Sequence, residues 1–177
     1  MRNFLIIALV GLGLLTLALV VRSGIFARKD PGRPINSTMR LAMENSGRAE
    51  LSTEDAWLVE KQFTSKHRQP SGLMYVPRRA GEGPTPKIGQ EIVVDYQGRL
   101  LDGTVFDSSY DKGVPLTFRV GLGQVIQGWD ESFLNMRKGE KRTLIIPYWL
   151  AYGVNGRPPT IPPRATLVFE VELLDIR

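Results

Sequence analysis

The chain contains 177 residues, no cysteine and a net charge of +5 at pH 7. Its length suits one domain with an appendage, and the lack of cysteine excludes disulfides, zinc–thiolate sites and a cysteine nucleophile. The charge excess is +4 in residues 1–50, which hold 7 Lys/Arg against 3 Asp/Glu, and only +1 in residues 51–177, which hold 16 against 15, so we expect no nucleic-acid partner.

An uncharged apolar run lies near the amino terminus, at residues 4–21 between Arg2 and Arg22. It is about long enough to cross a membrane as a helix and longer than the apolar part of most signal peptides. We therefore expect residues 1–22 to form a membrane anchor, with a cleaved signal peptide, and hence a secreted form, as the alternative. The positive-inside rule alone would keep the rest of the chain in the cytoplasm, but N-terminal segments of this kind usually direct the downstream chain to export. We favour the extracytoplasmic (periplasmic) side.

Residues 23–70 are expected to form a linker that contains a short helix. The helix is predicted to begin near Ser52, because Ser52-x-x-Asp55 resembles a capping box. Its apolar side is small and consists mainly of Trp57, Leu58 and Phe63. This helix is interpreted as a spacer; dimerisation, or a contact within an envelope complex, is the alternative.

Residues 71–177 are expected to form the folded domain, because apolar residues alternate with polar ones along most of this part. Asp102-Gly103 predicts a two-residue hairpin turn. Five or six strands are predicted, from the ranges near residues 73–78, 92–97, 104–107, 116–120, 144–146 and 167–173.

One helix is predicted between these strands, at residues 127–137, followed by Gly139 as its stop. Trp129, Phe133 and Met136 would share one face, and Arg137 and Lys138 would lie in the last turn, where the helix dipole favours them. The economical architecture is an α+β fold in which a curved antiparallel sheet wraps around this short helix.

The chemistry-bearing residues exclude several kinds of site. His67 is the only histidine and precedes the predicted domain, so neither a Ser/His/Asp triad nor a histidine metal site is expected. Gly121-x-Gly123 is not a dinucleotide loop, because Ile126 stands where the third glycine should be. What remains is a stretch rich in aromatic and aliphatic residues with one carboxylate, Asp107, which suggests a dry, ring-lined cleft.

Five ordered motifs resemble those of a known family. They are V-V-D-Y-Q-G-R-L-L-D-G-T-V-F-D-S-S, G-Q-V-I-Q-G-W, M-x-x-G-E-K, I-P-Y-W-L-A-Y-G and I-P-P-R-A-T-L-V-F-E-V-E-L-L, and they resemble the FK506-binding class of peptidyl-prolyl isomerases over residues 71–176. The S-G-L-M-Y-V segment resembles the branch that includes the bacterial macrophage infectivity potentiator proteins. The resemblance implies a five- or six-stranded antiparallel sheet around one helix, proline-containing polypeptide substrates, FK506- or rapamycin-like inhibitors, and neither metal nor cofactor.

The same resemblance implies which residues form the site. The expected catalytic residues are Tyr96, Phe106, Asp107 and Tyr152, and the expected substrate-binding residues are Val125, Ile126, Trp129 and Phe169. The indole would form the floor of the pocket, and the Ile126 N–H and the Tyr152 hydroxyl would bind substrate carbonyls. Without the resemblance, the apolar members would more often be ordinary core residues, and Asp107 would ordinarily be a turn residue.

Elementary physics supports the same role for these residues. Rotation about an X-Pro bond has a barrier of about 18–20 kcal/mol because amide resonance is lost at the midpoint, and no bond needs to break. An apolar socket can hold the proline ring while the preceding carbonyl turns. A proline-binding chaperone module with little turnover is the alternative function. The sequence departs from the family pattern at three positions, Lys112, Leu116 and Thr160. These departures bear on the affinity for macrolide inhibitors and on the preferred residue before proline.

Overall fold

The structure is a computed structural model that describes residues 50–177. The predicted membrane segment and most of the predicted linker lie outside these residues. Within the described part, no helix is both long and apolar enough to span a bilayer.

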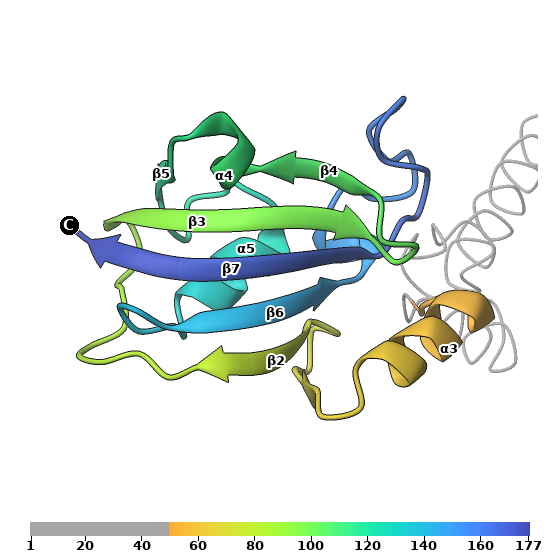
Figure 1. Ribbon diagram of the computed structural model, residues 1–177, viewed down its shortest axis with the longest axis horizontal. Helices are drawn as coiled ribbons and strands as arrows, with labels where there is room; N and C mark the ends of the chain where they lie inside the picture. The colour runs from red at the N-terminus through yellow and green to blue at the C-terminus, as the bar shows by residue number, and fades with distance from the viewer. Residues whose placement is uncertain (1–49) are drawn as a thin grey trace, which may run out of the picture. The chain divides into compact units, whose positions relative to one another are not determined.

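The described chain forms four short helical segments and seven strands (Figure 1). The helical segments are α3 (Thr53–Gln62), α4 (Ser109–Lys112), α5 (Gln127–Phe133) and the 3-10 turn η1 (Tyr148–Leu150). The strands are β1 (His67–Arg68), β2 (Met74–Arg79), β3 (Glu91–Leu100), β4 (Val105–Ser108), β5 (Leu116–Arg119), β6 (Lys141–Ile146) and β7 (Leu167–Ile176).

All strands join one antiparallel sheet in the order β1-β2-β6-β7-β3-β4, and β5 also pairs with β3. This confirms the predicted α+β class and the antiparallel sheet with a short helix. The sheet has 7 strands rather than five or six because the two-residue strand β1, in the segment assigned to the linker, pairs with β2. The long strand β3 has two separate partners on one side. Residues Glu91–Val94 of β3 pair with β5 and residues Gln97–Arg99 pair with β4, and α4 separates these two partners.

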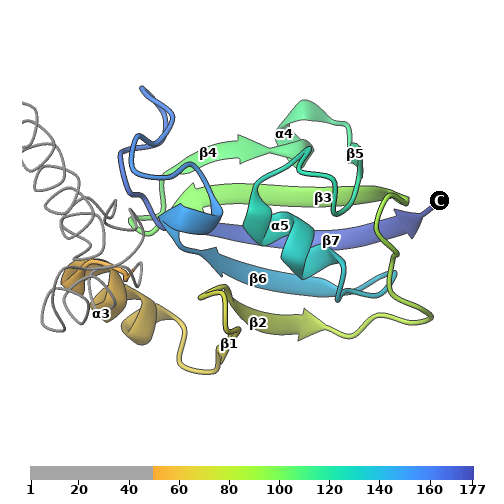
Figure 2. The ribbon, with the colours of Figure 1, turned by 180° about the vertical axis from the view of Figure 1, so that it is seen from behind.

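The helix α5 lies across one face of the sheet (Figure 2). Side chains along β6 alternate between the two faces of the sheet. Leu144 and Ile146 point toward α5 and belong to the cluster around Trp129 and Phe133, whereas Ile145 belongs to a second cluster on the other face. All three β6 residues are fully buried. The period-two pattern of the sequence therefore reflects a sheet that is covered on both faces at this end.

Helix α5 is shorter than predicted, since it ends at Phe133 rather than near residue 137. Met136 is buried as expected, but it reaches the core from a turn in which its N–H donates to the Phe133 carbonyl. Arg137 is not in a last helical turn, and its N–H donates to the Glu140 carboxylate. The chain then joins the sheet, where the Gly139 N–H donates to the Leu173 carbonyl at 2.7 Å.

The Asp102-Gly103 hairpin is present, but its loop is longer than two residues. The Leu100 N–H donates to the Thr104 carbonyl, and the Gly103 N–H donates to the Leu100 carbonyl. Gly103 has φ of 94°, and a register shift follows between Gly98 and Arg99. The loop is thus a turn followed by a bulge, a common alternative to the two-residue form.

Helix α3 packs against the face of the sheet opposite to α5. Ser52 caps it by accepting a hydrogen bond from the Asp55 N–H, as predicted. Phe63 is buried and Leu58 partly buried, as predicted, but Trp57 is 59% exposed, and the buried side is completed by Val59. These residues pack against the apolar residues Met74, Leu101, Ile145 and Val168.

The folded domain begins well before the predicted residue 71, because residues 49–177 form one compact unit. His67, which the sequence placed ahead of the domain, lies in β1 opposite Tyr75 and stacks on its ring at a centroid distance of 5.1 Å. The segment assigned to a linker therefore contributes a helix and a short strand to this unit.

We predict that Val59→Ala lowers the free energy of unfolding by about 2 kcal/mol, because two buried methyl groups are lost and a cavity remains. Val154→Ala is the matched control, because Val154 is 53% exposed and should change stability by less than about 0.5 kcal/mol. Urea unfolding of residues 49–177 measures both. Equal effects would show that α3 does not stabilise the sheet.

Candidate active site

A cleft of about 160 Å³ opens between α5 and the sheet. All eight residues predicted from the sequence line it. They come from six parts of the chain: Tyr96 from β3, Phe106 and Asp107 from β4, Val125 and Ile126 from the loop before α5, Trp129 from α5, Tyr152 from the turn after η1, and Phe169 from β7.

Aromatic rings form the base of the cleft. The Trp129 indole is 4% exposed, and its centroid lies 5.0 Å from that of Tyr96 and 5.2 Å from that of Phe169. Phe106 meets Phe169 at 5.5 Å. All three pairs are close to perpendicular, an arrangement that aromatic quadrupoles favour. The rings thus fix one another and leave an apolar surface.

Gly98 allows two of these rings to approach the backbone of β3. A Cβ at this position would lie 2.6 Å from Phe169 Cε1 and 2.8 Å from Phe106 Cε2. Any larger residue would have to displace one ring. The glycine of the D-Y-Q-G motif is therefore explained by close packing beneath the cleft.

Polar groups gather on the β4 wall of the cleft. The Tyr96 hydroxyl donates to Asp107 Oδ2 at 2.8 Å, and Lys112 forms an ion pair with Asp107 Oδ1. Lys112 Nζ also donates to the Tyr96 hydroxyl at 3.1 Å, and the Ser108 N–H donates to Asp107 Oδ1. The lysine that replaces the usual arginine of the family pattern therefore still reaches the carboxylate, with single contacts instead of a planar fork.

This network sets the protonation state of each member. Partial burial raises the pKa of Asp107, but the hydrogen bonds from Lys112 and Tyr96 outweigh it and hold the pKa below its ordinary value. Burial raises the pKa of Tyr96, and the hydrogen bond to Asp107 raises the pKa of Lys112. At neutral pH the wall therefore contains a carboxylate, a neutral phenol and an ammonium group.

The loop before α5 presents a backbone donor to the cleft. Ile126 is the N-cap of α5 in an extended conformation, and its N–H has no acceptor among residues 50–177. The loop is held by Asp130, whose two carboxylate oxygens accept from the N–H groups of Gly121 and Gly123, each at 2.8 Å. Both glycines have positive φ, so this tight loop depends on them.

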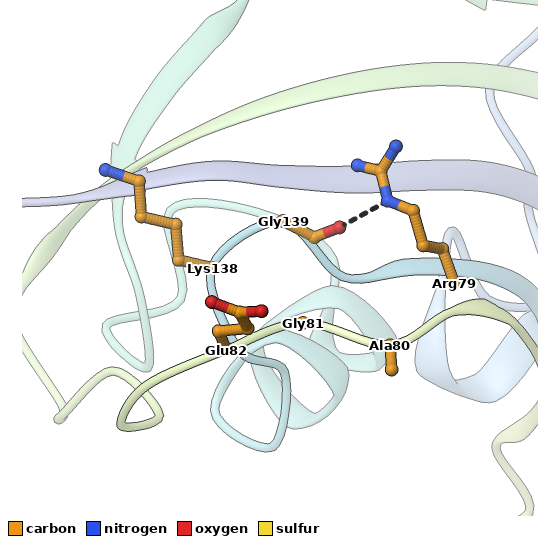
Figure 3. A pocket seen from close by; sticks show the side chains of 6 residues that line it. All are labelled: Arg79, Ala80, Gly81, Glu82, Lys138 and Gly139. Atoms are coloured by element: carbon orange, nitrogen blue, oxygen red, sulfur yellow. Dashed lines mark hydrogen bonds between the residues drawn. The ribbon is translucent and has the colours of Figure 1, made fainter.

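A second hollow, of about 380 Å³, lies where the chain leaves β2 and passes the connection from α5 to β6 (Figure 3). It is lined by Arg79, Ala80, Gly81, Glu82, Lys138 and Gly139. Arg79 Nε donates to the Gly139 carbonyl at 2.9 Å, and Glu82 pairs with Lys138 through the backbone. It contains none of the predicted site residues and no aromatic ring, so it lacks the surface that an apolar ring would bind.

Two residues that line the cleft were absent from the predicted site. Leu116 at the start of β5 is 36% exposed, and the exposed Gln124 accepts a hydrogen bond from the Arg119 N–H. Leu116 stood out in the sequence only as a departure from the family pattern. Gln124 stands immediately before the two predicted residues Val125 and Ile126, which is the only signal that pointed to it.

The arrangement suits binding and orientation of an amide more than bond-breaking chemistry. In residues 50–177, no three acidic or histidine side chains are grouped as metal ligands. The cleft supplies an apolar base, a free backbone donor, the Tyr152 hydroxyl and one paired carboxylate.

Comparison with known proteins identifies the family to which the chain belongs. Residues 83–174, just over half of the chain, match the family described as FKBP-type peptidyl-prolyl cis-trans isomerase. FkpA of Escherichia coli K12, named an FKBP-type peptidyl-prolyl cis-trans isomerase, is 51% identical over 107 residues, or 60% of this chain and 38% of its own length. The FK506-binding protein of Neisseria meningitidis serogroup B is 50% identical over 105 residues, or 59% of this chain and 96% of its own.

Two further matches define the extent of the likeness. FK506-binding protein 4 of Dictyostelium discoideum is 48% identical over 122 residues, which are 68% of this chain and 33% of that protein. The crystal structure of AtFKBP13 matches 64% of this chain and 99% of its own with 43% identity and a TM-score of 0.62. The chain thus spans about a third of the Dictyostelium and Escherichia relatives, so the likeness concerns one domain.

Proposed function

We propose that the chain, which belongs to the family of FKBP-type peptidyl-prolyl cis-trans isomerases, accelerates rotation about X-Pro bonds in proline-containing polypeptides. The observation that carries this proposal is the common cleft. Its eight predicted residues come from six parts of the chain and surround one apolar hollow. A set of unrelated core residues would not converge in this way.

The mechanism uses the cleft as a socket for the proline ring. Phe106, Trp129 and Phe169 hold the ring while the preceding carbonyl turns. The Ile126 N–H and the Tyr152 hydroxyl fix carbonyls on either side of the bond. The twisted amide has lost resonance and is less polar than the planar one, so an apolar cleft binds it in preference to the planar ground states.

Asp107 acts on the turning carbonyl. Its charge is kept by Lys112 and Tyr96, and it faces the carbonyl carbon as that carbon leaves the amide plane. No proton is transferred and no covalent intermediate forms. The rate gain comes from orientation and from preferential binding of the twisted geometry.

A protease-coupled assay with a Leu-Pro peptide tests the proposal. Acceleration by the wild-type protein that is lost in Phe106→Ala, with the fold intact by circular dichroism, supports it. Binding of the peptide without acceleration would instead favour a proline-binding module with little turnover. An FK506-class macrolide, which would occupy the same cleft, should inhibit the reaction competitively.

A flat pH profile is expected. Asp107 stays ionised because its pKa is lowered, and Tyr96 and Lys112 stay protonated because their pKa values are raised, so kcat/KM should change little between about pH 5 and 9. Because the folded-state pKa of Asp107 lies below its unfolded value, its stabilising contribution is present above the ordinary pKa of 3.8 and is lost as the pH falls through the lowered value. Line-shape analysis by nuclear magnetic resonance (NMR) measures the rate without a protease. A bell-shaped profile within this range would contradict the account.

The location and branch of the protein are also part of the proposal. The uncharged run at residues 4–21 supports an anchor that holds the domain on the extracytoplasmic side of a membrane. Protease added to intact cells or spheroplasts tests the orientation, and protection from added protease in spheroplasts would contradict it.

The S-G-L-M-Y-V segment that leads into β2 supports the macrophage-infectivity-potentiator-like branch. A phylogeny that groups the chain elsewhere would contradict that assignment.

A further inference from the structure

The segment between β6 and β7 carries positive charge only. Residues 147–166 contain two arginines, Arg157 and Arg164, and no lysine, aspartate or glutamate. Both arginines are exposed. In the described part of the chain, neither forms an ion pair with a carboxylate. Their charges are therefore available to a ligand.

Only one of the two arginines stands next to the cleft. The Arg157 guanidinium carbon lies 6.0 Å from the centre of the Tyr152 ring, and Tyr152 lines the cleft. Arg164 lies 5.6 Å from the centre of the Tyr148 ring, which does not line it. The two residues thus have the same charge and a similar setting, but only Arg157 adjoins a residue that lines the cleft.

The backbone holds Arg157 in place. Its N–H donates to the Ile161 carbonyl at 2.8 Å, and its carbonyl accepts from the Ile161 N–H at 2.9 Å. The preceding Gly156 has positive φ and touches the backbone of Pro162 so closely that a Cβ would collide with it. The guanidinium therefore extends from a fixed point on the rim.

The opposite wall does not cancel this charge. Asp107, the one carboxylate that lines the cleft, is neutralised locally by Lys112. Asp95, which accepts a hydrogen bond from Ser109, and Asp111 on α4 do not line it. The arginine beside Tyr152 thus adds a positive charge on one side only. A bound peptide would experience an asymmetric field across the cleft.

We propose that Arg157 selects proline segments that carry a carboxylate next to the proline, so that the cleft prefers acidic flanking residues to neutral ones of the same size. The inference rests on the proposed function, because it names the substrate class of the same site. The effect is one exposed ion pair in the bound peptide. Such pairs change binding by about two- to fivefold and weaken as salt rises.

Paired peptides test this inference. Glu and Gln are compared at the position before the proline and at the position after it, and kcat/KM is measured at low salt and at about 1 M salt, where charges are screened within a few ångströms. The wild-type protein should prefer Glu at one of the two positions by about two- to fivefold at low salt. The preference should vanish at high salt and in Arg157→Gln, whereas Arg164→Gln should keep it.

Several results would overturn the inference. They are a Glu-to-Gln ratio near one at both positions in the wild type, an unchanged ratio in Arg157→Gln, or an equal loss in Arg164→Gln. Activity on the Gln peptides tests the isomerase proposal separately. Dissociation constants for the same peptides, measured by NMR shifts, give the same ratio if turnover is absent, so the two proposals fail independently.

Discussion

Asp107→Asn is expected to lower kcat/KM for a prolyl peptide by about ten- to a hundredfold, because hydrogen bonds to charged groups contribute about 1.5–3 kcal/mol. The substitution keeps the size of the side chain and removes its charge. The ion pair with Lys112 is lost, and the Tyr96 hydroxyl loses its charged acceptor. The carboxylate that faces the turning carbonyl is lost as well.

Asp111→Asn is the matched control, because Asp111 is exposed on the neighbouring helix α4 and loses the same charge. It should stay within about twofold of the wild type, as surface substitutions of this kind usually do. Steady-state kinetics on one peptide compares the three proteins. A kcat/KM for Asp107→Asn within twofold of the wild type would show that the carboxylate does not take part.

Trp129→Ala is expected to lower the free energy of unfolding by about 3–5 kcal/mol. The indole is 4% exposed and contacts the rings of Tyr96, Phe118, Phe133 and Phe169. Its removal leaves a cavity that the mutually packed rings cannot close. Because small domains are stable by about 5–15 kcal/mol, the loss is a large part of the total.

Trp57→Ala removes the same side chain from a site that is 59% exposed, and it should cost less than about 0.5 kcal/mol. Urea unfolding followed by circular dichroism measures both variants. If Trp129→Ala unfolds at the same urea concentration as Trp57→Ala, the indole is not the packed floor that the cleft requires.

Local patterns predicted the parts of the fold that depend on neighbouring residues. Leu144, Ile145 and Ile146 alternate between the two faces of the sheet as a period-two strand should. The end of α5 was misjudged because Arg137 and Lys138 are typical of a last helical turn. The segment that follows α5 is tied to the sheet by the bond from the Gly139 N–H to the Leu173 carbonyl, which joins residues far apart in the sequence.

Long-range packing also explains the other differences. In α3, Trp57 is the larger apolar residue, yet Val59 is the one that packs against Ile145 and Val168 of the sheet. Both partners are far from Val59 in the sequence, so the local pattern does not predict this contact. The eight site residues were predicted through the family resemblance, and the structure brings them together. Gln124 lines the cleft because of how its loop is folded by Asp130, which periodicity does not reveal.

The most direct test is NMR exchange spectroscopy of a Leu-Pro peptide with a catalytic amount of the protein. Uncatalysed prolyl bonds interconvert over tens to hundreds of seconds, so cis and trans signals give no exchange peaks within a mixing time of about one second. With the wild-type protein, exchange peaks should appear, and they should fade in Asp107→Asn. Line broadening at the peptide without exchange peaks would mean that the cleft binds proline but does not turn the bond.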